Sequence, residues 1–195
     1  MEKKVTLIAC SIFQEELEHI LKQDQPGLTI NWLEVGLHDN IERLEEELGR
    51  QLEGCRSEGT EAGFLYGWAC LPEMKKFAES RGVKYLGAKN CLAALVGDDK
   101  LKELEQNRTL VASPGWVRKM WLGRAGSATG WTADDYRMQF GRYDLILVLD
   151  PGLNPLSDEE IITCFDLIQV PIETRPCDLE HFKTAFGSLI DKLRQ

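Results

Sequence analysis

The sequence lacks the features that mark membrane proteins and nucleic-acid-binding proteins. Charged residues interrupt every hydrophobic run, so the ~20 consecutive apolar residues of a membrane span are absent. Basic residues are also scarce, because 23 Lys and Arg stand against 32 Asp and Glu and give a net charge of −9. This balance argues against binding to a nucleic-acid backbone or an anionic membrane. We expect neither nucleic acid nor membrane as a partner.

We expect no export signal at the start of this sequence. Only residues 5–9 separate Lys4 from Cys10, whereas the apolar core of a secretory signal needs ~7–15 residues. Six cysteines without such a signal belong in a reducing compartment, where thiols ligate metals, react, or simply pack. We therefore expect a cytoplasmic protein.

The common catalytic and nucleotide-binding motifs are absent too. The chain has no Walker A loop, no Gly-x-Gly-x-x-Gly, no Gly-x-Ser-x-Gly and no His-Glu-x-x-His. The usual P-loop, Rossmann, esterase and zincin signatures therefore give no indication of function.

What the sequence does contain is a regular alternation of strand and helix patterns over 195 residues. The strands are predicted at 5–9, 28–35, 62–69, 83–88, 109–113, 143–149 and 167–170. The helices are predicted at 13–21, 41–52, 72–81, 91–105, 133–140, 158–164 and 179–193. This alternation predicts an α/β fold with a mainly parallel, doubly wound (Rossmann-like) sheet and helices on both faces. We expect a single domain, 1–195.

Four residues with metal-binding or nucleophilic side chains each follow a predicted strand: Cys10, His38, Cys70 and Cys91. The carboxyl ends of parallel strands share one edge of a sheet, so these side chains are expected to converge there. Helix N-termini at that edge favour thiolates. Three thiolates and an imidazole suit a zinc or iron ion, or an iron–sulfur cluster. The sequence predicts a metal site of Cys10, Cys70 and Cys91, with His38 as a fourth ligand.

Other interpretations of the same cysteines stay open. One cysteine can be a nucleophile, activated by His38 and a helix N-terminus, that acts on a small molecule. The cysteines can also be packing residues, as we expect for Cys55, Cys164 and Cys177. A third possibility is a noncatalytic module that binds a small molecule or a corrinoid protein. The sequence does not decide whether the protein is an enzyme.

Two further motifs flank predicted strand ends and are candidates for ligand binding. They are Tyr66-Gly67, ahead of Cys70, and Pro114-Gly115-Trp116, after the fifth predicted strand. The segment 117–141, rich in Gly, Trp and Arg, is predicted to be a lid or an insertion. As a lid it would place Trp116 beside the cysteines, with residues 117–131 mobile and Arg118 or Arg124 reaching an anionic ligand. The alternative is a small satellite core of tryptophans.

The same motifs support a family resemblance. They are Ile8-Ala-Cys10, Gly36-Leu-His38, Leu65-Tyr-Gly67 with Cys70, Asn90-Cys91, and Ser113-Pro-Gly-Trp116. In this order they resemble the family called domain of unknown function 1638, from about residue 5 to 116 and more weakly beyond. The resemblance implies that its recurrent positions are Cys10, His38, Tyr66, Gly67, Cys70, Cys91, Pro114, Gly115 and Trp116. It also implies a setting in anaerobic, corrinoid-dependent one-carbon metabolism, with a corrinoid or methyltransferase protein as a partner.

Overall fold

The computed structural model describes residues 3–21, 27–124 and 131–195. The chain divides into two compact units, the first made of Met1–Asp98 and Leu179–Gln195 and the second of Asp99–Asp178. The sequence predicted one sheet in one domain, whereas the described strands form two sheets, one in each unit. Hydrophobic periodicity locates strands but does not say which strands bond to each other, so it does not reveal this division.

The sheet of the first unit is parallel throughout and carries its strands in the order β2-β1-β3-β4. The strands are β1 (Val5–Cys10), β2 (Leu28–Leu33), β3 (Glu61–Leu65) and β4 (Lys84–Tyr85). All side chains of β1 are buried, because this strand lies inside the sheet and is covered on both faces. That double burial explains its short, nearly continuous apolar run.

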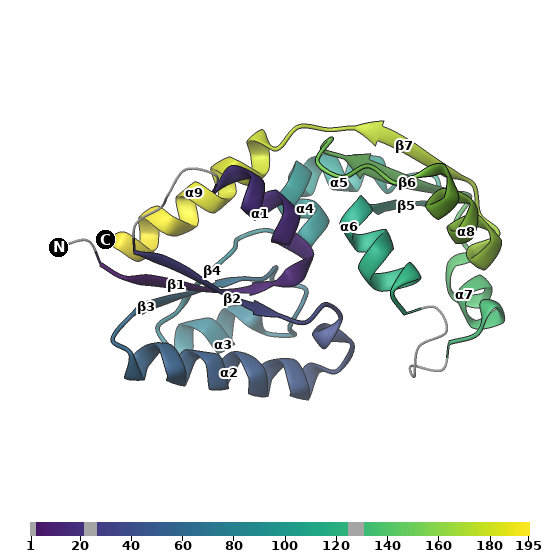
Figure 1. Ribbon diagram of the computed structural model, residues 1–195. Coiled ribbons are helices and arrows are strands. Elements are labelled where there is room, and N and C mark those ends of the chain that lie inside the picture. The colour runs from purple at the N-terminus through teal and green to yellow at the C-terminus, as the bar shows by residue number, and fades with distance from the viewer. Residues whose placement is uncertain (1–2, 22–26, 125–130) are drawn as a thin grey trace. The chain divides into compact units, whose positions relative to one another are not determined.

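Helices cover both faces of the first sheet, which confirms the predicted doubly wound α/β class (Figure 1). They are η1 (Ser11–Phe13), α1 (Gln14–Ile20), η2 (Leu37–Asp39), α2 (Ile41–Ser57), α3 (Met74–Ser80), α4 (Cys91–Val96) and α9 (Glu180–Arg194). Figure 1 shows α2 and α3 on one face and α1 and α9 on the other. Leu44, Leu48 and Leu52 are buried along the side of α2, which contacts β1 and β3. Their spacing is the amphipathic pattern that predicted this helix.

The second unit is a smaller parallel sheet with the strand order β5-β6-β7. Its elements are α5 (Asp98–Leu104), β5 (Thr109–Ala112), α6 (Pro114–Trp116), the π-helix η3 (Val117–Leu122), α7 (Ala133–Phe140), β6 (Leu145–Asp150), α8 (Asp158–Ile168) and β7 (Ile172–Pro176). Trp121, Ile146, Val148 and Cys164 are central to its core. Cys164 is fully buried there, as expected for a packing thiol.

The predicted helix 91–105 is divided in the structure. Gly97 separates α4 from α5 with a φ of 92°, a conformation that residues with a Cβ atom rarely adopt. A Cβ atom there would also lie 3.2 Å from Cε1 of His181 on α9. The break therefore depends on the absence of a side chain at residue 97.

The predicted strand 167–170 is wrong. Ile168 is the last residue of α8, and the strand in this part of the chain is β7. Ile168 and Val170 are apolar because they are buried in the core of the second unit. β7 lies at the edge of its sheet and is largely exposed, so it has no apolar run by which to identify it.

Within the described part of the chain, no helix combines the length and apolar character needed to cross a membrane.

Candidate functional site

The first cysteine of the site ends a central strand. Cys10 is the last residue of β1 and is paired in register with Leu33 of β2. On the other side of β1, Ala9 is paired with Leu65, the last residue of β3. Cys10 comes directly after Ala9, and Tyr66 comes directly after Leu65. Both residues therefore lie at the carboxyl edge of the sheet.

Tyr66 is a buried side chain whose hydroxyl is not satisfied. Its exposed fraction is 2%, and its Oη atom has no hydrogen-bond partner among the described residues. Burial raises the pKa of Tyr66 above its ordinary range, and the neighbouring thiols of Cys10 and Cys70 raise this pKa further. A side-chain hydrogen bond with Cys10 is a further cause of this increase, so the Cys10 thiol lies near the hydroxyl, although the contact does not have ordinary hydrogen-bond geometry. A buried polar group without a partner is costly, so its retention needs a reason.

The loop after β3 runs beside the loop after β4 and brings Cys70 into the site. The backbone amides of Trp68 and Ala69 donate hydrogen bonds to the carbonyls of Ala88 and Lys89, at 3.0 and 2.9 Å. Gly67 permits this approach, because a Cβ atom at that position would lie 2.4 Å from the Lys89 carbonyl oxygen. The Cys70 amide then closes a turn onto the Gly67 carbonyl at 3.1 Å.

Cys91 enters the site from the loop after β4. It is the first residue of α4, and Asn90 caps this helix by accepting a hydrogen bond from the Ala93 amide at 2.9 Å. Ala88 and Lys89, which come just before Cys91, accept hydrogen bonds from the loop that leads to Cys70. The segments that lead to Cys70 and to Cys91 therefore lie side by side.

The three thiols influence one another electrostatically. Burial raises the pKa of Cys70 to about 11, and Cys10 contributes to this increase. Burial also raises the pKa of Cys91, with further contributions from Cys70 and Cys10. The effect that the sequence predicted for helix amides is present at Cys91, but it is not the largest effect on this thiol. Backbone amides at the start of α4 do lower its pKa, but burial outweighs them.

These four residues, Cys10, Tyr66, Cys70 and Cys91, are hereafter called the thiol cluster. All six cysteines of the chain are described, and none of them forms a disulfide. In the described ranges, no three His, Cys, Asp or Glu side chains stand ready to hold one metal ion. Coordination by the three thiols would therefore require their side chains to rotate and lose protons.

His38 has a different environment from the cysteines. It lies in η2 and is exposed, and its Nε2 is 3.6 Å from Oδ1 of Asp39. The groups that raise the pKa values of Cys70 and Cys91 do not include His38. Its role as a fourth ligand stays a prediction.

The Pro114-Gly115-Trp116 motif forms α6 of the second unit. Ser113 caps this short helix by accepting a hydrogen bond from the Trp116 amide at 3.2 Å. The Trp116 ring meets Trp121 edge-on with ring centroids 4.9 Å apart, and Trp121 meets Phe140 in the same way at 4.9 Å. Because Trp116 belongs to the second unit, its expected position beside the cysteines stays a prediction.

The predicted lid is partly described. Val117 and Trp121 are buried in η3, and Trp121 is only 1% exposed, so this part of segment 117–141 is anchored in the core of the second unit. Residues 133–140 form α7 as predicted, whereas residues 125–130 lie outside the described residues. The described tryptophans therefore match the satellite-core alternative.

Arg118, a candidate for binding an anionic ligand, already has a carboxylate partner. Its Nε and Nη2 donate to the two carboxylate oxygens of Glu160, at 2.6 and 2.9 Å. It also donates to the carbonyls of Asn154 and Pro155. An anionic ligand would have to compete with these bonds, while the role predicted for Arg124 stays a prediction.

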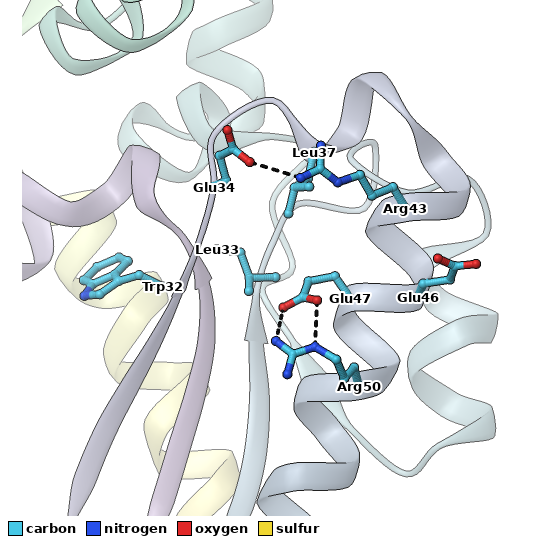
Figure 2. Close-up of a pocket in the computed structure, with 8 residues that line it drawn as sticks. All are labelled: Trp32, Leu33, Glu34, Leu37, Arg43, Glu46, Glu47 and Arg50. Atoms are coloured by element: carbon cyan, nitrogen blue, oxygen red, sulfur yellow. Dashed lines mark hydrogen bonds and ion pairs between the residues drawn. The ribbon is translucent and has the colours of Figure 1, made fainter.

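A pocket that the sequence did not indicate lies between the end of β2 and α2 (Figure 2). Its volume is about 410 Å³, within the ~300–1,000 Å³ typical of small-molecule sites. We call it the arginine pocket, lined by Leu33, Glu34, Leu37, Arg43, Glu47 and Arg50 among others. Sequence reasoning missed it because arginines and glutamates spaced along a helix are typical of a solvated face.

Comparisons with known proteins give a family and a distant structural likeness. No curated protein matches the sequence. A solved structure described as unliganded arylmalonate decarboxylase superposes with a TM-score of 0.36 and 12% identity, covering 99% of this chain and 93% of that chain. The family model described as protein of unknown function (DUF1638) matches residues 32–186. That range covers most of the sequence and includes His38, Cys70 and Cys91, so the chain belongs to the DUF1638 family.

Proposed function

We propose that Cys10, Cys70 and Cys91 bind a thiophilic metal centre, either a zinc or iron ion or an iron–sulfur cluster. The observation that carries this proposal is that Cys10 at the end of β1, Cys70 after β3 and Cys91 at the start of α4 lie close enough to interact: Cys10 raises the pKa of Cys70, and both raise the pKa of Cys91. Buried thiols that repel one another as anions stay protonated without a cation. A metal ion reverses this balance, because it binds the thiolates and displaces their protons.

The chemistry of the donor set fits such a centre. Three thiolates satisfy most of a tetrahedral zinc site and leave one position for a ligand or substrate. The same set suits an iron–sulfur cluster with one ligand from another source. A bound metal would supply Lewis acidity or electron transfer, according to its identity. The protein residues would hold it and exclude water from it.

Tyr66 supports the proposal as a positioning residue. Its buried hydroxyl has no hydrogen-bond partner among the described residues, and Cys10 is its neighbour. A protonated thiol is a weak hydrogen-bond acceptor, whereas a metal-bound thiolate is a good one. With metal bound, the Tyr66 hydroxyl would donate a hydrogen bond to the Cys10 sulfur and orient it. This hydrogen bond would give the buried Tyr66 hydroxyl a function.

The family resemblance adds a setting to this proposal. It implies a cytoplasmic protein of anaerobic, corrinoid-linked one-carbon metabolism, with a corrinoid or methyltransferase protein as a partner. The reducing environment that such metabolism needs would also keep the thiols available for a metal.

Anaerobic purification followed by metal and sulfide analysis tests the proposal directly. We expect bound metal, and we expect Co²⁺ added to the metal-free protein to give an intense sulfur-to-metal charge-transfer band. Each of the three single substitutions, Cys10→Ser, Cys70→Ser and Cys91→Ser, should remove or weaken this band. Cys177→Ser is the matched control, because Cys177 lies outside the thiol cluster, and it should leave the band intact.

Two results would overturn the metal proposal. One is a purified protein without metal that gives no charge-transfer band with Co²⁺ while all three thiols titrate. The other is a single cluster cysteine that is alkylated far faster than the other two at neutral pH, which would indicate the nucleophile instead. Retained binding of a small molecule or corrinoid protein after replacing all three cysteines would favour the noncatalytic module.

A further inference from the structure

We propose that the arginine pocket binds a small organic molecule through a carboxylate group held by Arg50 and Arg43. The proposal is independent of the metal centre, because it concerns different residues and is tested on metal-free protein. Figure 2 shows both arginines reaching from α2 toward the end of β2, while Glu46 points away from the enclosed space.

Arg50 has a two-point partner before a ligand arrives, although its side chain is 67% exposed. Its Nε and Nη2 donate to the two carboxylate oxygens of Glu47, at 2.9 and 2.6 Å. Glu47 is itself held by Gln51 at 3.0 Å, and Gln51 accepts a hydrogen bond from Asn31 of β2 at 3.0 Å. The bonds to Glu47 use one edge of the guanidinium group. Nη1 and the second Nη2 hydrogen then form another edge, which matches a second carboxylate.

Glu47 stays ionised and keeps Arg50 in this orientation. Its hydrogen bonds with Arg50 are the main cause that lowers the pKa of Glu47 to about 2. The charge of this carboxylate is thus already shared with Arg50 and Gln51. It repels an incoming anion less than an unpaired carboxylate would.

Arg43 holds its present partner weakly. Its Nη2 is 3.3 Å from Oε2 of Glu34, and both side chains are mostly exposed, at 64% and 72%. An ion pair between two exposed side chains contributes little to stability. A ligand carboxylate would compete with Glu34 for Arg43, and the exposed, single contact between them makes Glu34 the easier partner to displace.

The remaining walls of the pocket select a ligand with an apolar part. Leu33 and Leu37 line the pocket between the charged residues, and because they are 4% and 6% exposed they offer a small apolar area. Together with the volume of about 410 Å³, this lining suits a short-chain or aromatic carboxylate.

The arginine pocket is a neighbour of the thiol cluster. Leu33, which lines the pocket, is paired in register with Cys10. The charge of Glu47 also contributes to the raised pKa of Tyr66. Both links lie at the carboxyl edge of the first sheet, where ligands bind in folds of this type.

NMR titration of the full-length, metal-free protein with butyrate, benzoate and inorganic phosphate tests the inference. We expect both carboxylates to shift the Arg50 Nε–Hε resonance in a saturable way. Arg50→Gln should weaken binding by about tenfold or more, and Arg50→Lys should also weaken it because the fork geometry is lost. Glu34→Gln should strengthen binding several-fold, because it releases Arg43.

Arg142→Gln is the matched control. It removes one positive charge from an arginine that contacts Tyr143 in the second unit, and it should leave binding unchanged. The inference is overturned if neither carboxylate shifts the Arg50 resonance, or if phosphate alone binds. It is also overturned if Glu34→Gln weakens binding, or if Arg142→Gln reduces it as much as Arg50→Gln does.

Discussion

A Cβ atom on Gly67 would lie 2.4 Å from the carbonyl oxygen of Lys89 and 2.6 Å from the Cα atom of Asn90. Both of these atoms belong to the backbone, so neither can turn aside as a side chain would. The close approach joins the loop that carries Cys70 to the loop that carries Cys91. The spatial relation between the two thiols therefore depends on the absence of a side chain at residue 67.

Gly67→Ala should destabilise the protein by roughly 2–3 kcal/mol, because the two loops must separate to admit the methyl group. The control is Gly87→Ala, where an added Cβ atom meets nothing within 4 Å. We expect this control to stay within about 0.5 kcal/mol of the original protein. Urea denaturation of the three proteins measures both effects, and equal stability of Gly67→Ala and Gly87→Ala would contradict the expectation.

The stability of the metal-free protein should fall as pH rises above about 9. Burial raises the pKa of Cys70 from its ordinary value to about 11, so the folded state binds the proton more tightly than the unfolded state. The stabilisation is complete below the unfolded pKa and is lost as pH rises to about 11, amounting to at most about 3 kcal/mol. Cys70→Ser should reduce the loss measured by urea denaturation between these pH values. An unchanged pH dependence in this variant would contradict the assignment.

Tyr66→Phe should affect the metal-free and metal-bound proteins in opposite directions. Without metal, removing a buried hydroxyl that has no partner should leave stability unchanged or raise it by up to ~1 kcal/mol. With metal, loss of the proposed hydrogen bond to Cys10 should weaken Co²⁺ affinity about tenfold. Thermal denaturation and Co²⁺ titration measure the two effects, with Tyr85→Phe as the control for loss of a phenol. Equal Co²⁺ affinities in Tyr66→Phe and Tyr85→Phe would remove the positioning role.

Glu160→Gln should destabilise the protein by about 1–2 kcal/mol at neutral pH, because it breaks the paired hydrogen bonds to Arg118. The Arg118 bonds lower the pKa of Glu160 to about 2. The stabilisation is therefore present above the ordinary carboxyl pKa and is lost as pH falls toward about 2.

Asp144→Asn is the comparison for Glu160→Gln. The Arg108–Asp144 ion pair is 61% and 64% exposed and should contribute little. Urea denaturation at several pH values checks both expectations. A Glu160→Gln effect no larger than that of Asp144→Asn would show that the Arg118 bonds do not stabilise the fold.

The sequence predicted the parts of the site that depend on where strands end. Cys10 ends β1, whereas Cys70 and Cys91 follow β3 and β4, and parallel pairing brings strand ends to one edge whatever the loops contain. The raised pKa values were not predictable, because burial of the loops decides them and spacing does not report burial. The unsatisfied hydroxyl of Tyr66 was missed for the same reason.

The arginine pocket and β7 escaped prediction for a different reason. Arg43, Glu47 and Arg50 have the spacing of an exposed helix face, and only the position of α2 against β2 makes them a pocket wall. β7 is an exposed edge strand, and because its side chains are not buried it has no apolar pattern that would identify it. Local sequence patterns predict single helices and strands. The arginine pocket and the position of β7 depend on how helices and strands pack against each other.

The last helix completes the unit in which the chain begins. Phe182 of α9 stacks on Phe13 with ring centroids 5.2 Å apart, and Leu193 occupies the space that a side chain on Gly63 of β3 would need. During synthesis, residues 99–178 must be made before α9 is available, which takes on the order of ten seconds. For that time, α9 is missing from the face of the sheet that it covers together with α1. Ribosome-bound chains that stop before residue 179 should therefore depend on chaperones, because α9 is missing from the first unit.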